Sequence, residues 1–567
     1  MSDLNEYIIT CKSYDDLEDL YEDMETPGGS LYIPNRAVEL VHRRKISRNT
    51  HYMLTEGEAA EIRKDRRVIA CERPAEDRGL VPTPLWTQTG DFNKTTGTFS
   101  GDDRNWGLYR VVEGDTVANW GSDSTAEITN KTIVTTSSGK NVDVIIVDSH
   151  INPDHPEFAV NSDGTGGSRV NQYNWFQHSD ELGYVTTPEN YPYSTSGASP
   201  NNNHGTHVAG TVAGNTQGWA RDANIYNITF TKYRFGNTPP SWSDNWSDIF
   251  LDYIREFHYY KTTNAATGRI NPTITNHSWG WSYVNISLSD IISVTYRGTT
   301  TTVSGTNAQR KVTLEDNGVP VPANTYLYSA PVRIASLDAD IQDAIDEGII
   351  FVSSAGNSYW KCDTSTGDDY NNSIVWDDDG TLRTVYHSRG ASPASADNVI
   401  CVGSIGSKVN EYKSDFSNWG ERVDIWAPGS DIISAVYDQS SANSEGYGSL
   451  PQDSRNSSYY LGSINGTSMS SPQVCGVIAC LAETEPNLTQ AQALQYLKEN
   501  SLSELGTTGT INHSTYEALG DSHNRYLYLY QKRQKTGSLQ PTIFGNRNSD
   551  SSGVKYPRTN RSVTKRQ

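Results

Sequence analysis

Short apolar runs along the middle of the chain alternate with segments that are apolar on one face only. A nearly continuous apolar run at residues 142–147 predicts a parallel strand covered on both faces. Further strand-like runs begin at residues 273, 348 and 398. Apolar residues recur at helical spacing over residues 249–257, 337–346 and 488–500. This alternation predicts an α/β domain with a doubly wound, mainly parallel sheet and helices on both of its faces.

The first 80 residues carry a shorter pattern of their own. Strand-like runs occupy residues 7–11, 37–41 and 67–71. A helix is expected to start near Ser13, and Thr55 and Glu58 form a capping box that opens a second helix. This order of strands and helices predicts a small α+β domain of the ferredoxin-like, split βαβ type.

Three further stretches break the regular pattern. Residues 81–105 are rich in Thr, Gly, Pro and Asp, which predicts a linker or exposed loop. Residues 283–331 are rich in Thr and Val and contain turn signals, which predicts a β-rich insertion. Beyond about residue 505 the chain becomes polar and basic, as is typical of a flexible surface arm. We therefore expect a small domain at 1–80, a linker at 81–105, a main domain at 106–504 and a tail at 505–567.

Composition and charge exclude several classes of protein. The net charge of −21 argues against broad nucleic-acid binding. No apolar run approaches the roughly 20 residues that span a bilayer, and the N-terminus lacks the basic start and apolar stretch of a secretory signal. We therefore expect a protein that stays inside the cell or is carried in an assembly such as a particle. The six cysteines show no metal-ligand spacing or dense disulfide pattern, so we expect buried free thiols and no metal site.

Residues 465–472 place a serine, Ser468, in the first turn of a predicted helix. Val474, Val477, Ile478 and Leu481 recur at helical spacing, so one face of this helix is expected to be buried. Pro472 fits near a helix start, where its missing N–H needs no partner. The free N–H groups and positive dipole end of the helix favour an oxyanion beside the serine. Serine is also an ordinary capping residue, so a nucleophile here needs partners elsewhere in the chain.

Candidate partners follow other predicted strands and helices. Asp148 ends the strand at 142–147, at the edge where ligands bind in open α/β sheets, although an Asp there also caps turns. His204 starts a helix of small residues. His207 lies one turn further on, and no metalloprotease pattern follows, so we interpret it as a packing residue. Asn357 follows the strand that begins at residue 348.

These residues together supply the groups for acyl transfer through a serine nucleophile. In this interpretation His204 takes the proton of Ser468, and Asp148 holds the imidazole in the required tautomer. The side chain of Asn357 and the backbone N–H of Ser468 donate to the oxyanion.

At these residues the chain resembles the subtilisin-like serine proteases, the subtilases of peptidase family S8. The matching stretches are residues 147–149, 204–210, 355–357 and 466–472. The order Asp, His, Ser along the chain is also that of the family. The resemblance covers roughly residues 106–500 and implies that Ser278, Trp279 and Gly280 pair with an extended substrate and wall the main specificity pocket. No cofactor is implied for the chemistry; the family often binds structural calcium, for which no ligand set is identified here.

Residues 1–80 resemble the inhibitory propeptide of the same family, most clearly at residues 54–72. The resemblance implies a serine endopeptidase that acts on proteins or peptides and is made as a zymogen inhibited by its own propeptide. It also implies self-cleavage at or near Leu80-Val81. The alternative is an inactive binding or structural protein of an assembly that keeps the scaffold, motivated by the missing signal and the basic tail. Against this alternative, every catalytic position holds the required residue type.

Overall fold

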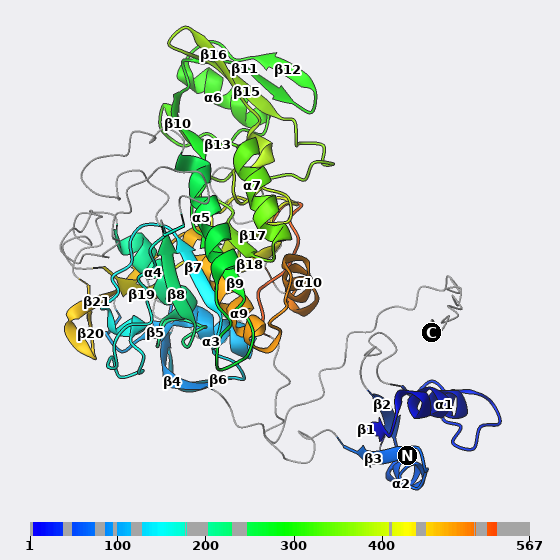
Figure 1. Ribbon diagram of the computed structural model, residues 1–567. Helices are drawn as coiled ribbons and strands as arrows, with labels where there is room; N and C mark the ends of the chain where they lie inside the picture. The colour runs from blue at the N-terminus through cyan, green and yellow to red at the C-terminus, as the bar shows by residue number, and fades with distance from the viewer. Residues whose placement is uncertain are drawn as a thin grey trace. The chain divides into compact units, whose positions relative to one another are not determined.

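The computed structural model divides the chain into two compact units, and each is described separately (Figure 1). The described residues of one unit lie within Met1–Thr83, and those of the other lie within Pro84–Gln531. The structure describes residues 4–37, 48–73, 86–94, 99–114, 127–175, 177–178, 202–228, 246–407, 411–437, 450–503, 505 and 519–529.

The first unit is a three-stranded antiparallel sheet with two helices. Its elements are β1 (Asn5–Cys11), α1 (Tyr14–Glu25), β2 (Asn49–Leu54), α2 (Glu56–Ile62) and β3 (Val68–Glu72), with strand order β2-β1-β3. The predicted starts of the two helices are confirmed: Ser13 caps α1, and Thr55 forms a capping box with Glu58 at the start of α2. The small α+β domain predicted from the sequence is therefore present.

The sequence pattern missed one strand of this sheet, β2. It pairs with one edge of the central strand β1, and β3 pairs with the other edge. Of the strand predicted at residues 37–41 only Ala37 is described, where it makes an isolated bridge to Tyr52 of β2, and the rest lies outside the described residues. The buried positions of β2 include Thr50 and His51, and these polar residues hide the strand from an apolar pattern.

The second unit is built on a six-stranded parallel sheet, which confirms the predicted α/β fold. Its strands are β7 (Asp143–Val147), β8 (Asn224–Ile228), β9 (Thr273–His277), β14 (Ile350–Ser354), β17 (Ile400–Ile405) and β18 (Ile425–Pro428), in the order β18-β17-β14-β9-β7-β8. All five pairings are parallel. Five of the strands, all except β8, are buried at every position. The apolar runs in the sequence thus reflect coverage on both faces.

Helices pack on both faces of this sheet. They are α3 (Trp106–Glu113), α4 (Asn202–Ala213), α5 (Trp246–Tyr260), α7 (Ala335–Asp346), α9 (Thr467–Thr484) and α10 (Gln490–Asn500). Val144 and Ile146 of β7 belong to the apolar core that contains α4 and α9. Ile145 and Val147 belong to the core that contains α5 and α7. Successive side chains of one strand therefore enter opposite cores, as a doubly covered sheet requires.

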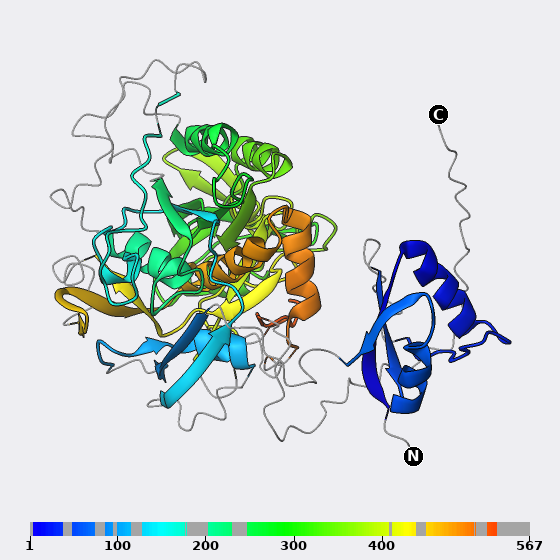
Figure 2. The ribbon, with the colours of Figure 1, turned by 60° about the horizontal axis from the view of Figure 1, so that its bottom comes forward.

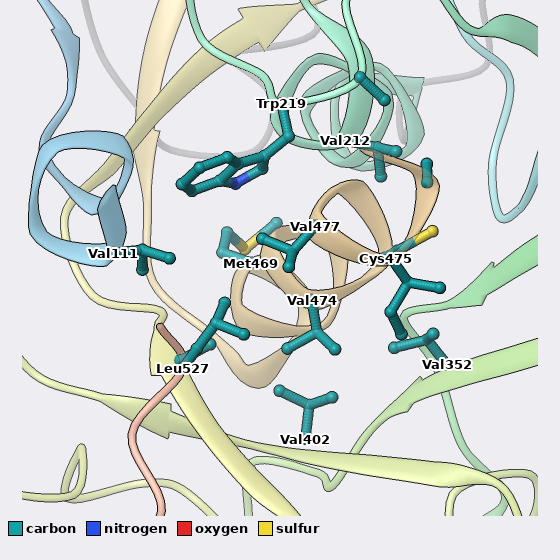
Figure 3. Close-up of a cluster of buried hydrophobic side chains, with 14 of the residues drawn as sticks. Val111, Val212, Trp219, Val352, Val402, Met469, Val474, Cys475, Val477 and Leu527 are labelled. Atoms are coloured by element: carbon teal, nitrogen blue, oxygen red, sulfur yellow. The ribbon is translucent and has the colours of Figure 1, made fainter. Parts of the chain in front are cut away.

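Helix α9 occupies the centre of the larger core. Figure 3 shows its Val474 and Val477 among Trp219, Val402 and Leu527, which come from distant parts of the chain. Val474, Val477 and Ile478 of the predicted face are buried, whereas Leu481 is half-buried. The predicted place of Pro472 is wrong, because the helix starts at Thr467 and the proline lies inside it.

The predicted insertion is larger and less purely β than expected. It contains β10 (Ser282–Ser287), β11 (Ile291–Tyr296), β12 (Thr299–Thr302), α6 (Asn307–Asp316) and β13 (Tyr326–Pro331). Two later strands, β15 (Ser373–Asp378) and β16 (Thr381–Val385), complete the four-stranded sheet β12-β11-β15-β16. The insertion, here these seven elements, has an apolar core of its own (Figure 1). Its helix starts with a capping box of Thr306 and Gln309 inside a stretch that the Thr and Val content marked as β.

The boundaries predicted for the linker and the tail are also wrong. Within the predicted linker, β4 (Trp86–Asn93) pairs with β6 (Glu127–Thr135), and β5 (Arg104–Asn105) completes their sheet (Figure 2). Within the predicted tail, Tyr526 and Leu527 are fully buried in the core that contains α9. The backbone of Leu527 donates to Trp426 on β18 at 2.8 Å, so this segment extends the edge of the main sheet.

A three-stranded antiparallel sheet completes the second unit. It consists of β19 (Ile432–Val436), β21 (Asn456–Ile464) and β20 (Gln452–Asp453), in that order, and β19 packs against α4. Among the described helices of both units, none is long and apolar enough to cross a membrane.

Candidate active site

Three neighbouring strands of the parallel sheet end at the candidate site. Asp148 follows β7, Ser278 follows β9 and Asn357 lies three residues beyond β14. These strands are adjacent in the order β14-β9-β7, so their carboxyl ends share one edge of the sheet. This edge is where ligands bind in open α/β folds. Helices α4 and α9 contribute His204 and Ser468 from their first turns.

Asp148 and His204 form a hydrogen-bonded pair. Oδ1 of Asp148 lies 2.8 Å from Nδ1 of His204, and it also accepts the backbone N–H of Ser149 at 2.7 Å. The carboxylate is 2% exposed, whereas the imidazole is 35% exposed. An acceptor at Nδ1 favours the tautomer in which Nδ1 carries the proton and Nε2 has a lone pair. In this tautomer Nε2 of His204 is able to accept a proton.

The start of α4 packs tightly against the loop that follows Asp148. The backbone N–H of Gly205 donates to Oγ of Ser149 at 2.8 Å. A Cβ at position 205 would lie 2.4 Å from the carbonyl oxygen of Ser149, which is too close for any side chain. Glycine after His204 thus allows the helix to bring the imidazole within hydrogen-bonding distance of the carboxylate.

Ser468 is held by two hydrogen bonds to Ser278. Its Oγ donates to the carbonyl oxygen of Ser278 at 3.1 Å, and Oγ of Ser278 donates to the carbonyl oxygen of Ser468 at 2.9 Å. Pro472 explains the second bond. The residue four positions after Ser468 would normally donate its N–H to this carbonyl, and proline has none.

Asn276 extends the hydrogen-bond network around Ser468. Its Nδ2 donates to Oγ of Ser278 at 2.9 Å, and its Oδ1 accepts from Oγ of Ser471 at 2.8 Å. All these groups are buried. The end of β9 and the first turn of α9 are therefore joined by side chains whose donors and acceptors are matched, which restricts the movement of Ser468.

Asn357 presents a hydrogen-bond donor to the same site. Its Oδ1 accepts from the backbone N–H of Thr467 at 2.9 Å and from Oγ1 of Thr467 at 2.7 Å. Because a backbone N–H can only donate, the facing atom is the oxygen, and Nδ2 remains a donor for another group. Gly356 precedes it with a φ of 103°, and a Cβ there would lie 2.5 Å from Nδ2 of Asn418. Glycine is required for the turn that orients this amide.

Ser468 and Asn357 lie at a pocket of about 230 Å³. Residues 278–282 form one wall and residues 354–358 another, while Pro331, Trp360 and Ala391 contribute further lining. None of the 17 lining residues is Asp, Glu, Lys, Arg or His. The pocket therefore suits an uncharged side chain, since a charged one would lose its hydration without gaining a partner.

The buried histidine next to the pair behaves as a packing residue. Nε2 of His207 lies 2.8 Å from the carbonyl oxygen of Ile432 and 3.1 Å from that of Gly462, so it carries a proton and donates. Burial lowers the pKa of His207 to about 3. Within the ranges that the structure describes, no group of three or more His, Cys, Asp and Glu side chains is placed to hold a metal ion.

A family model described as "Subtilase family" matches residues 139–528. The chain belongs to the subtilase family. The matched segment extends past residue 505 and includes the buried residues of the predicted tail, in agreement with the corrected boundary. It also contains every residue placed at the site above.

Two proteases resemble the chain at low identity. It is 25% identical over 379 residues to "Alkaline protease 1" of Emericella nidulans, covering 66% of this chain and 59% of that protein. It is 24% identical over 448 residues to "Subtilisin-like serine protease Cla h 9.0101" of Davidiella tassiana, covering 77% of this chain and 62% of the relative. The chain thus spans about three fifths of the length of these relatives. A solved structure, "Crystal structure of a cold adapted subtilisin-like serine proteinase", matches with a TM-score of 0.42 at 20% identity, covering 75% of this chain and 98% of that one.

In this subtilase the structure brings most of the predicted site residues together. Asp148 contacts His204, and the pocket collects Ser468, Asn357 and the segment Ser278, Trp279 and Gly280. Leu80 and Val81 lie outside the described residues. Sequence reasoning missed the lining by Trp281, Ser282, Ser329, Pro331 and Trp360. The available signal was that the predicted insertion begins directly after the predicted substrate-binding segment.

Proposed function

We propose that this subtilase is a serine endopeptidase with Asp148, His204 and Ser468 as its catalytic triad. A substrate main chain lies along residues 278–280 and places an uncharged side chain in the neutral pocket. Oγ of Ser468 turns from the carbonyl of Ser278 toward Nε2 of His204, loses its proton to it and attacks the scissile carbonyl carbon. The Asp148 carboxylate stabilises the resulting imidazolium.

The remaining steps use the same groups. Nδ2 of Asn357 and the backbone N–H of Ser468 donate to the oxyanion of the tetrahedral intermediate. Its collapse breaks the C–N bond, and His204 gives its proton to the leaving amine. Water then enters, is deprotonated by His204 and hydrolyses the acyl ester of Ser468. The sequence of steps needs no cofactor beyond the chain's own side chains and water.

One observation carries this proposal. The carboxylate and imidazole are paired at 2.8 Å in a family member whose serine and amide donor line one pocket. The test is labelling with a fluorophosphonate probe, read by peptide mapping, together with peptide hydrolysis. The parent should be labelled at Ser468 and should hydrolyse peptides, and Ser468→Ala should do neither. Ser470→Ala, which removes a buried hydroxyl two residues away, is the matched control and should retain both. A parent without labelling or hydrolysis would favour the binding-protein alternative.

We also propose that the first unit is an inhibitory propeptide removed by the chain itself. Strand β3 ends at Glu72, eight residues before Leu80, and the neutral pocket suits a leucine side chain. Cleavage is expected at or within a few residues of Leu80-Val81. Because the two parts are covalently linked, the first-order rate constant should not depend on protein concentration.

Intact mass measurement of freshly expressed protein tests this second proposal. The parent should be recovered cut near Leu80, and Ser468→Ala should remain full length. Self-processing is ruled out by a parent that stays full length while hydrolysing peptides, or by cleavage of Ser468→Ala at the same place without added protease.

A further inference from the structure

We infer that the ribbon formed by β10 and β13 extends the substrate-binding cleft and binds apolar side chains on the amino-terminal side of the scissile bond. The inference rests on the proposed function, because it assigns a specificity element to the same cleft. The occupant is the substrate polypeptide itself, beyond the residue held in the pocket. Figure 1 shows the ribbon between the four-stranded sheet of the insertion and the helices that cover the parallel sheet.

The ribbon is continuous with the pocket and fixed to its walls. Strand β10 begins at Ser282, two residues after Gly280. At the junction Trp281 donates its backbone N–H to Ser392 at 3.0 Å and accepts from Val332 at 3.0 Å. On the other strand, the indole N–H of Trp360 donates to the carbonyl oxygen of Ser329. A peptide that enters the pocket therefore meets a ribbon already in place, and little ordering cost opposes binding.

One face of the ribbon leads from the pocket to an exposed valine. In the antiparallel register Ser282 opposes Pro331 and Val284 opposes Ser329. Directly opposed residues share a face, and side chains on one face repeat every second residue, so these four side chains lie on one face. Three of them line the pocket, and Val284 is the fourth. Val284 lies roughly 6–7 Å beyond Ser282 along β10, which corresponds to about two residues of an extended peptide.

The backbone explains why Val284 is exposed rather than buried in the insertion. Asn285 has a φ of 55°, a left-handed conformation that interrupts the alternation of the strand. Ile286 beyond it is 4% exposed, whereas Val284 before it is 64% exposed. The first half of β10 thus presents its apolar side chain to solvent beside the pocket.

The chemistry of the ribbon is apolar and neutral. Trp281, which lines the pocket, is 38% exposed and adds to the apolar surface beside it. Strands β10 and β13 contain no charged residue. An apolar surface of this kind next to a binding cleft favours apolar and aromatic side chains, and an acidic side chain placed on it would lose hydration.

The test compares quenched fluorogenic peptides with identical residues around the scissile bond, using the full chain as recovered from expression. The short peptide has two residues on the amino-terminal side of the cleaved bond. The long peptide has four further apolar residues at its amino terminus, and a third peptide has four aspartates there instead. The parent should cleave the apolar long peptide with a kcat/KM about tenfold above that of the short one, or ~1.4 kcal/mol. The aspartate extension should give no gain.

Substitutions on the insertion locate the effect. Val284→Asp should reduce the tenfold preference for the long peptide to about twofold. Val312→Asp on α6 and Leu382→Asp on β16 are the matched controls, because these side chains are 56% and 67% exposed and do not line the pocket. Both controls should keep the full preference.

The outcomes that overturn the inference differ from those that overturn the proposed function. A parent that cleaves both peptides equally well, or that gains only from extension on the carboxyl side, overturns the inference alone. So does a preference that survives Val284→Asp or that disappears in both controls. A parent that cleaves no peptide and is not labelled at Ser468 overturns the proposed function, and the inference with it.

Discussion

Lowering the pH should destabilise the second unit through three buried histidines. His207, His277 and His387 are at most 1% exposed, and burial lowers the pKa of each to about 3. In the unfolded chain the same side chains titrate near ~6.5. Between these values the unfolded chain binds protons that the folded chain does not. The stability present above pH ~6.5 is therefore lost as the pH falls toward 3.

The magnitude follows from the size of the shift. Each proton bound only by the unfolded chain changes the free energy of unfolding by about 1.4 kcal/mol per pH unit. At pH 5, which is about 1.5 units below the unfolded pKa, one histidine has cost about 2 kcal/mol and three have cost about 6 kcal/mol. Because a domain is stable by only about 5–15 kcal/mol in total, this loss is large.

The assay is the free energy of denaturant unfolding of Ser468→Ala, which cannot digest itself, between pH 7 and pH 5. The slope near pH 5 should correspond to uptake of about three protons or more. His277→Gln and His387→Gln should each lower this uptake by about one proton, whatever they do to stability at pH 7. An uptake of one proton or fewer, or a slope that neither substitution changes, would refute the reasoning.

Three further predictions concern the active site. Asn357→Leu should lower kcat by about 10²–10³-fold with little change in KM, a magnitude taken from the loss of the oxyanion donor in subtilisin. Equal kcat values for this variant and the parent would remove Asn357 from the mechanism. His204 must be neutral to act as a base, and an ordinary imidazole titrates near ~6.5. On the acid side of this titration kcat/KM should fall about tenfold per pH unit. A kcat/KM that stays constant into acid would exclude a histidine base. Ser278→Ala leaves the buried carbonyl of Ser468 without its donor and should lower the free energy of unfolding by about 1–3 kcal/mol. Adding Pro472→Ala supplies a backbone N–H to that carbonyl, so thermal unfolding of the double variant should recover part of the loss, and no recovery would contradict the account of the network.

Some elements were predictable because one local interaction determines them. Strand β7 is apolar at every position after Asp143, since both of its faces are covered, and the run at 142–147 was recognisable for this reason. The capping boxes are equally local, as at Thr55 and Glu58. The residues proposed for catalysis were found from short motifs at the ends of such elements, and the structure places Asp148 and His204 in contact.

Other features depend on contacts that no local pattern encodes. Strand β4 is a Thr-rich segment that resembles a loop until it pairs with β6, which buries Phe92. The lining of the pocket combines Trp281, Pro331 and Ala391, which are separated by up to 110 residues in the sequence. Pro472 lies inside α9, and Ser278, which is distant in the sequence, donates to the carbonyl that the proline leaves without its usual backbone donor.

The six cysteines described above make the protein a reporter of its own partial unfolding. All six are free and buried, and burial raises the pKa of each thiol. The folded chain therefore presents protonated, shielded thiols that react slowly with alkylating reagents, and reaction marks the opening of the surrounding structure. Cys11 and Cys71 lie in the first unit and the other four in the second. Alkylation followed by peptide mass analysis would thus measure the opening rate of each unit separately in one sample.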